Sequence, residues 1–286
     1  MLRREDIQVL EKGSPAYPEE WLALSDAPER VYAIGNIALL SARKITVVGS
    51  RRTPVQAVKL GGEIAKELST HFALVTGVAE GGDSAVIEGA LLGTGDIICV
   101  LAGGLNALPQ GNLTLLERVA KKGLLLSPCP LETGVRNFSY EYRNKLLALL
   151  GVATLVLGAG EKSGALITAR YAKEAGKRVF ALPYSPWTSA GKGCNALIKA
   201  GAGVAENAED ILTAFGIENR QMSTLILTDE EARVLAYVRE AGEAHATAVA
   251  QNAGVPVFKI RALLASLEVK GAVIAVGGNR YSAINK

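Results

Sequence analysis

Residues 45–54 read Ile-Thr-Val-Val-Gly-Ser-Arg-Arg-Thr-Pro, and this stretch decides the fold. An apolar, β-branched run ends at Gly49, and the final proline begins an amphipathic helical pattern. A strand that stops at a glycine before a helix is typical of phosphate sites, because the glycine lets an anion approach the helix N-terminus. Arg51 and Arg52 add fixed positive charge. Since the stretch lacks both the G-x-G-x-x-G and the GK[ST] patterns, it predicts phosphate binding at Gly49, Ser50, Arg51 and Arg52 without an ordinary NAD or ATP site.

Short apolar runs and helical patterns alternate along the next part of the chain. The runs are continuous, which is typical of strands buried on both faces. Strands are predicted at 45–49, 74–77, 97–101, 124–127, 154–159 and 178–183. Helices are predicted at 54–70, 82–92, 111–122, 140–150, 164–175 and 193–200. The order predicts an α/β fold, a Rossmann-like, doubly wound and mostly parallel sheet that binds ligands at the carboxyl ends of its strands.

A smaller unit is predicted after this sheet. Residues 216–227 are predicted to be a linker, and residues 228–286 hold three helical patterns and two strand-like runs around a Gly-Gly turn. This order predicts a winged helix-turn-helix. Its acidic and basic residues nearly balance, which favours a protein contact or a weak DNA contact. The Rossmann-like domain is predicted to span residues 1–215, with residues 1–44 as a segment packed on it.

Composition limits the remaining classes of protein. The chain has 286 residues and a formal net charge of +3, so a site for a polyanion has to be local. Cys99, Cys129 and Cys194 match no metal spacing and fit a reducing cytosol. The sequence contains neither a signal-peptide pattern nor an apolar run long enough to span a bilayer. We therefore expect a cytoplasmic protein with no metal, cofactor or membrane span.

Residues suited to catalysis are sparse. His71 and His245 are the only histidines, and no Ser-His-Asp order, HExxH, CxxC or paired-carboxylate loop is present. The sequence therefore predicts no catalytic residue and a protein that is not an enzyme. Asp83 is the best isolated acid near a strand end, and an anchor for the loop at Thr76-Gly77 is its favoured role.

A series of short motifs lies in a fixed order along most of the chain. They are Val48-Gly49-Ser50-Arg51-x-x-Pro54, Thr76-Gly77-x-x-x-Gly81-x-Asp83, Gly89-Ala90-Leu91, Gly104-Leu105, Arg143-Asn144-Lys145, Ser163-Gly164-Ala165-Leu166-Ile167-Thr168-Ala169, Leu182-Pro183 and Asn195-x-Leu197-Ile198-x-x-Gly201-Ala202. In this order they resemble the DprA/Smf family of DNA-processing proteins. The resemblance implies a homodimer that binds and protects single-stranded DNA and loads RecA recombinase in natural transformation or homologous recombination.

Two further segments extend the phosphate site into a predicted groove. Ser163-Gly164 begins a helix and provides either a second set of N–H donors or a plain N-cap. Residues 138–145 combine rings with cations, as single-strand binders do, and either Phe138 or Tyr140 is the stacking ring. The predicted DNA-binding residues are Gly49, Ser50, Arg51, Arg52, Phe138, Arg143, Asn144, Lys145, Ser163, Gly164 and Thr168.

Other interpretations remain open. Glu80 stands where the family often has Arg or Lys, and a carboxylate beside a phosphate site would repel DNA. A Rossmann-like nucleotide sensor that signals through its winged helix is one alternative function. A LOG-type nucleoside-monophosphate phosphoribohydrolase is another, although such enzymes need a P-G-G-x-G-T-x-x-E loop and the closest glycine loop here, Gly158-Ala159-Gly160-Glu161, lacks that pattern.

Overall fold

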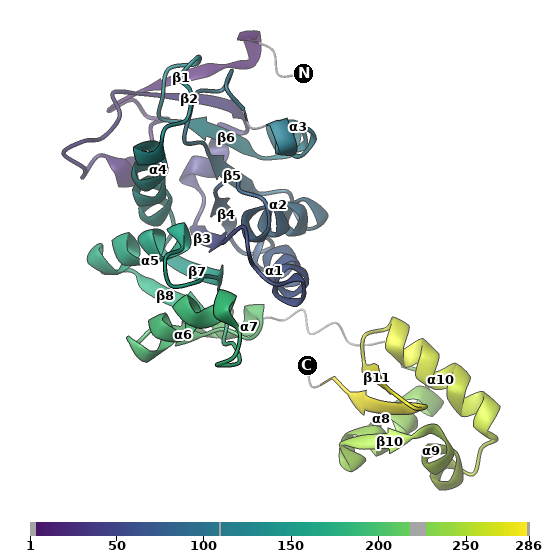
Figure 1. The fold of residues 1–286 in the computed structure, drawn as a ribbon. Helices are drawn as coiled ribbons and strands as arrows, with labels where there is room; N and C mark the ends of the chain where they lie inside the picture. Colours follow the sequence, from purple (N-terminus) through teal and green to yellow (C-terminus); the bar gives the residue numbers. More distant parts are fainter. Residues whose placement is uncertain (1–3, 109, 218–226, 285–286) are drawn as a thin grey trace. The chain divides into compact units, whose positions relative to one another are not determined.

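The computed structural model describes residues 4–108, 110–217 and 227–284, and the chain divides into two compact units between residues 218 and 219 (Figure 1). Most of the predicted linker, residues 218–226, lies outside the described residues. The two units are therefore described separately.

A nine-stranded sheet forms the centre of the first unit, in the order β1-β2-β6-β5-β4-β3-β7-β8-β9. The strands are β1 (Gln8–Glu11), β2 (Arg30–Gly35), β3 (Lys44–Gly49), β4 (Ala73–Thr76), β5 (Ile97–Val100), β6 (Leu124–Ser127), β7 (Ala153–Gly158), β8 (Arg178–Ala181) and β9 (Gly203–Val204). Neighbours from β6 to β9 are parallel, whereas β2 is antiparallel to both β6 and β1. The predicted α/β fold with a mostly parallel sheet is confirmed.

The first 44 residues do more than pack on the sheet, because they supply β1 and β2. β2 pairs with β6 and satisfies backbone groups that an edge strand would leave open. Trp21 is fully buried, and its indole N–H donates to the Leu146 carbonyl at 3.0 Å. This segment is therefore integral to the unit.

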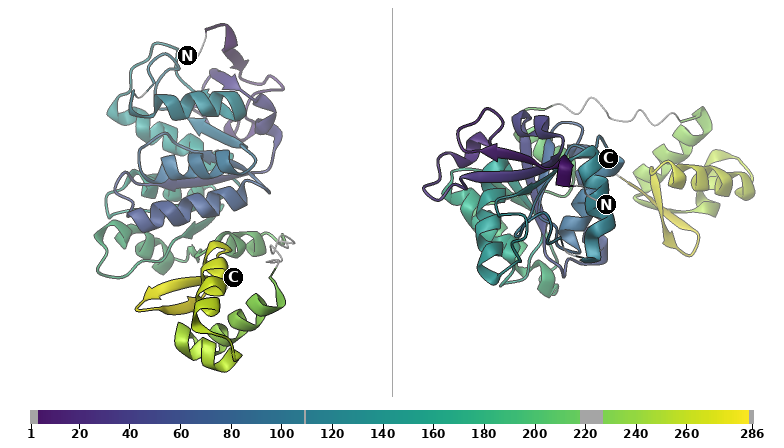
Figure 2. Two further views of the ribbon diagram at one scale, coloured as in Figure 1. Left: turned by 90° about the vertical axis from the view of Figure 1, so that its right-hand side faces the viewer. Right: turned by 90° about the horizontal axis from the view of Figure 1, so that it is seen from above.

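Helices cover both faces of the sheet (Figures 1 and 2). One face carries α1 (Val55–Leu68), α2 (Gly82–Leu92), α3 (Leu113–Lys122) and α7 (Ala208–Ala214), and the other carries α4 (Asn137–Leu150), α5 (Gly164–Glu174) and α6 (Lys192–Lys199). Successive strand residues enter the two apolar layers in turn, as Val47 and Val48 do. This explains the continuous apolar runs, since both faces of each strand are buried. The sequence did not predict α7 or β9, and α4 begins earlier than predicted.

The order in which strands are added to the sheet reverses beside β3. From β3 it continues to β4, β5 and β6 on one side, and after α4 it returns to β7 on the other side. The carboxyl ends of β3 and β7 therefore flank a topological switch point, where open α/β sheets bind their ligands. The loops that follow these two strands begin at Ser50 and Ala159.

The second unit contains three helices and a three-stranded antiparallel sheet. Its elements are α8 (Asp229–Ala241), β10 (Glu243–His245), α9 (Ala246–Ala253), α10 (Val257–Val269), β11 (Val273–Gly277) and β12 (Arg280–Ala283). Gly277 pairs with Arg280, so the turn is Gly278-Asn279 and not the predicted Gly-Gly pair. Both turn residues have positive φ, 57° and 58°, as a type I′ hairpin requires. These are the elements that the winged-helix prediction requires.

Candidate nucleic-acid interface

A groove of about 790 Å³ opens at the switch point between the ends of β3 and β7. We call it the switch-point groove. Among the residues that line it are Gly49, Ser50, Arg51, Arg52, Arg143, Asn144, Ser163, Gly164 and Thr168. Segments predicted separately from the sequence thus lie around one cavity, and of the predicted DNA-binding residues only Phe138 and Lys145 do not line it.

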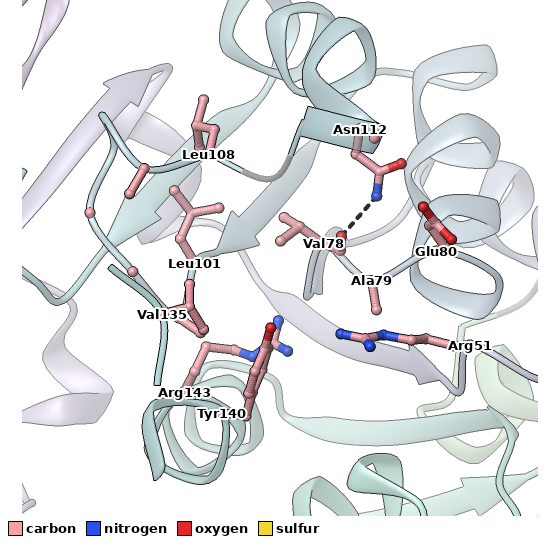
Figure 3. A pocket seen from close by; sticks show the side chains of 15 residues that line it. Arg51, Val78, Ala79, Glu80, Leu101, Leu108, Asn112, Val135, Tyr140 and Arg143 are labelled. Atoms are coloured by element: carbon pink, nitrogen blue, oxygen red, sulfur yellow. Dashed lines mark hydrogen bonds between the residues drawn. The ribbon is translucent and has the colours of Figure 1, made fainter. Parts of the chain in front are cut away.

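One face of α4 forms a wall of this groove. Tyr140, Arg143, Asn144 and Leu147 line the groove and follow the i, i+3, i+4, i+7 spacing of a single helical face. The centroid of the Tyr140 ring lies 6.0 Å from Cζ of Arg51 and 6.0 Å from Cζ of Arg143. Figure 3 shows the three side chains together. Tyr140 is therefore the aromatic ring that the fold places beside the predicted phosphate site.

Phe138 and Lys145 belong to another face of α4, seven residues apart. The Phe138 side chain is 69% exposed and does not line the switch-point groove. Lys145 Nζ forms an ion pair with Asp26 Oδ1 at 2.7 Å, and Tyr142 O–H donates to the Asp26 carbonyl at 2.6 Å. The positions of Phe138 and Lys145 around α4 thus keep these two predicted residues out of the groove. Of the two candidate rings, Tyr140 is the one that lines the groove.

The Gly49 and Ser50 amides do not form the predicted phosphate cradle. Gly49 N–H donates to Asp83 Oδ1 at 3.1 Å, and Ser50 N–H donates to the Gly158 carbonyl at 2.9 Å. Glycine is required at position 49 because a Cβ there would lie 2.6 Å from Cα of Gly82. The glycine therefore serves close packing between β3 and α2, and neither the Gly49 nor the Ser50 amide is free to donate to a phosphate.

Asp83 anchors the loops around the groove. Its buried carboxylate accepts from the amides of Gly49 and Ala79 at 3.1 and 3.2 Å. Burial raises the pKa of this carboxyl, while the nearby Arg143 charge and the two amides oppose the shift. Asp83 therefore anchors loops as predicted, but the backbone amides that it holds are those of Gly49 and Ala79 and not those of Thr76 or Gly77 themselves.

Arg143 forms part of the groove floor. Its side chain is buried, and one guanidinium nitrogen donates to the Val100 carbonyl at 3.2 Å. Burial lowers the pKa of this guanidinium, and the Asp83 carboxylate opposes that shift. Its buried Nε has no hydrogen-bond partner among the described residues.

The beginning of α5 faces the groove from the β7 side. Ser163 caps the helix by accepting Ala165 N–H at 3.3 Å, as predicted for an N-cap. Asn144 Nδ2 donates to the Gly164 carbonyl at 3.1 Å and ties α4 to this helix start. The hydroxyl of Thr168 is buried against the groove and has no partner among the described residues. The helix N-terminus is therefore available to an anion, whereas the Thr168 hydroxyl lies beneath the groove surface.

The groove rim is cationic. Arg51, Arg52 and Lys162 are exposed, and no ion pair within the described part of the chain includes any of them. Glu161 also lines the groove, but Lys192 lies 3.6 Å from its carboxylate. The groove rim therefore has an excess of positive charge, which makes it a local site for a polyanion in a chain of small net charge.

A second cavity of about 330 Å³ adjoins the groove and was not predicted from the sequence. We call it the side cavity (Figure 3). It shares with the groove Arg51, Ala79, Tyr140 and Arg143. Glu80 lines this cavity and not the groove, and within the cavity it stands beside Arg51 and Arg143.

Features of other protein classes are lacking in the described residues. They contain no helix with the length and apolar character to cross a bilayer. They also contain no cluster of three or more His, Cys, Asp or Glu side chains arranged to hold a metal ion.

Comparison with known proteins identifies relatives over most of the chain. The profile of the family described as DNA recombination-mediator protein A matches residues 8–216. The DNA processing protein DprA of Bacillus subtilis is 33% identical over 222 residues, covering 77% of this chain and 75% of that protein. Protein Smf of Escherichia coli is 30% identical over 290 aligned positions, covering 97% of this chain and 78% of Smf.

Two solved structures share the fold of the first unit. The X-ray structure of DprA from Streptococcus pneumoniae superposes with a TM-score of 0.69 at 31% identity, over 73% of this chain and 74% of that one. DNA processing protein A from Helicobacter pylori superposes with a TM-score of 0.67 at 27% identity, over 73% of this chain and 95% of that one. The latter structure was reported for the protein's single-stranded DNA binding mode.

Proposed function

Because the chain belongs to the DNA recombination-mediator protein A family of DNA-processing proteins, we propose that its switch-point groove binds single-stranded DNA. One observation carries the proposal: unpaired Arg51, Arg52 and Lys162, the α5 N-terminus and the Tyr140 ring surround one groove. The binding mode reported for the Helicobacter pylori relative supports it.

In the proposed mechanism, charge holds the backbone of the strand and an aromatic ring holds a base. Arg51 and Arg52 contact phosphates, and the start of α5 contacts a neighbouring phosphate. A base stacks on Tyr140, at about 1–3 kcal/mol per stacked base. Arg143 and Asn144 act mainly by holding the walls, since their side chains are buried and bonded to the Val100 and Gly164 carbonyls.

The proposal includes no covalent step. Asp83 is buried and accepts two backbone amides, and Ser163 caps α5. Because the Asp83 carboxylate and the Ser163 hydroxyl are used in these hydrogen bonds, positioning roles are supported over acid–base or nucleophilic roles. No cofactor is needed for the proposed binding.

On the family resemblance we extend the proposal to loading of RecA recombinase by a cytoplasmic homodimer. Light scattering of the purified chain tests the dimer. Assembly of RecA on strands precoated by a single-strand-binding protein, with and without the chain, tests the loading.

A competition experiment tests the groove and separates it from the alternatives. A labelled oligo-dT is titrated with the protein at low salt, and fluorescence anisotropy reports binding. We expect saturable binding that unlabelled oligo-dT reverses and that thymidine monophosphate reverses only weakly. Saturable binding of the mononucleotide without oligo-dT binding would support the sensor, and release of free base from it would support the hydrolase.

A further inference from the structure

The side cavity has the size and walls of a nucleobase site. Its volume of about 330 Å³ lies within the range of small-molecule pockets. Its apolar lining consists of Val78, Leu101, Leu108 and Val135. Arg51 and Tyr140 line both this cavity and the groove, so a strand with a phosphate at Arg51 has a base within reach of the cavity.

The backbone donors of one cavity wall are already used. Leu101 N–H donates to the Leu126 carbonyl at 2.8 Å, Gly104 N–H to the Thr133 carbonyl at 2.8 Å, and Ala107 N–H to the Gly104 carbonyl at 3.0 Å. These amides cannot donate to a ligand without breaking the wall. These three amides therefore contribute no donor to a ligand in the cavity.

Beside the guanidinium donors of Arg51 and Arg143, two other polar side chains of the cavity present acceptors. Asn112 Nδ2 donates to the Val78 carbonyl at 2.8 Å, which leaves its Oδ1 as the unused end of the amide. Glu80 is exposed at the cavity and forms no hydrogen bond or ion pair within the described residues. A Cβ at Gly111 would lie 2.9 Å from Glu80 Oε1, so the glycine leaves room for the carboxylate (Figure 3).

We infer that the side cavity selects a base with an exocyclic amino group, cytosine ahead of thymine, with Glu80 as the acceptor. The inference rests on the proposed function, since it requires a strand in the groove. Cytosine presents its N4 amino group as a donor, and a carboxylate is the side chain that accepts from it. Thymine presents the O4 acceptor at the same place, which a carboxylate repels.

The test compares oligo-dC with oligo-dT of equal length by anisotropy, at mildly alkaline pH where cytosine N3 is unprotonated. We expect oligo-dC to bind about fivefold more tightly, the lower bound for a specific side-chain contact with a base. Glu80→Ala is expected to remove the preference. Glu161→Ala, which removes a carboxylate from the groove and not from the side cavity, should retain it.

The outcomes separate this inference from the proposal on which it rests. Equal affinity for the two oligonucleotides overturns the base selectivity and leaves the binding groove in place. A preference that survives Glu80→Ala, or that disappears equally in Glu161→Ala, also overturns it. Failure of both oligonucleotides to bind contradicts the proposed function itself.

Discussion

Replacing Gly82 by alanine should damage both the fold and the groove. A Cβ at Gly82 would lie 2.3 Å from Cα of Gly49 and 2.8 Å from its carbonyl carbon. Carbon atoms pack best at about 3.5–4.0 Å, so the end of β3 and the start of α2 must separate by roughly 1 Å. Gly82 N–H also donates to the Ser50 carbonyl at 3.2 Å, and Gly49 N–H donates to Asp83.

The expected cost follows from these contacts. Overpacking costs about 1–3 kcal/mol, and weakening the buried bond from Gly49 to Asp83 costs about 1–3 kcal/mol. We therefore expect Gly82→Ala to lower the free energy of unfolding by about 2–6 kcal/mol, measured by urea denaturation and far-UV circular dichroism. Because Ser50 and Arg51 move with β3, oligo-dT affinity should fall as well.

Gly62→Ala is the matched control in the same helix pair. Gly62 lies within α1, and a Cβ there would meet the Ala85 carbonyl at an ordinary 3.5 Å. The substitution should stabilise α1 by about 0.5–1 kcal/mol and leave DNA binding unchanged. A Gly82→Ala variant as stable as the native chain, or a Gly62→Ala variant equally damaged, would refute this reasoning.

Three further outcomes are expected. Tyr140→Ala should weaken oligo-dT binding by about 1–3 kcal/mol, whereas Phe138→Ala should change it far less; equal losses in anisotropy titrations would contradict the placement of the ring. Thr168→Val should raise the melting temperature, because it replaces a buried hydroxyl that has no partner among the described residues by a methyl group of similar size; a lower melting temperature would contradict this. The hydrogen bond from Lys270, at 2.6 Å, is the main cause that lowers the pKa of Glu231 to about 2. This pKa is below the ordinary glutamate value of about 4.3, so the ionised Glu231 stabilises the fold above about pH 4.3, and this stabilisation is lost as the pH falls toward about 2. Circular dichroism melts at a series of pH values should show the loss of stability, and Glu231→Gln should not show it.

The layered fold was predictable because its signal is local. The apolar runs at 45–49 and 154–159 are continuous since alternate residues enter opposite cores, and that pattern is visible in the sequence. β1 gave no such signal, because only Leu10 of its four residues is buried. β9 spans two residues, too few for any periodicity.

The site was predictable in its segments but not in its contacts. The sequence could not show that the Gly49 amide is taken, because its partner Asp83 lies 34 residues away. Tyr140 could have been found, since Tyr140, Arg143 and Leu147 share a helical face. The sequence leaves Phe138 and Tyr140 as alternatives, because the spacing from Phe138 to Arg143 is two residues longer than in the family pattern, and the predicted helix began only at residue 140. The helix in fact begins at residue 137.

The salt dependence of single-stranded DNA binding tests the central claim most directly. Each phosphate contact contributes about −0.7 to the slope of the logarithm of the association constant against the logarithm of salt concentration. Arg51→Ala is expected to bind oligo-dT more weakly, with a slope shallower by about 0.7. Lys145→Ala, whose ammonium pairs with Asp26 away from the groove, should keep the native slope. A native slope in Arg51→Ala, or an equal reduction in Lys145→Ala, would contradict the assignment of the switch-point groove as the phosphate-binding site.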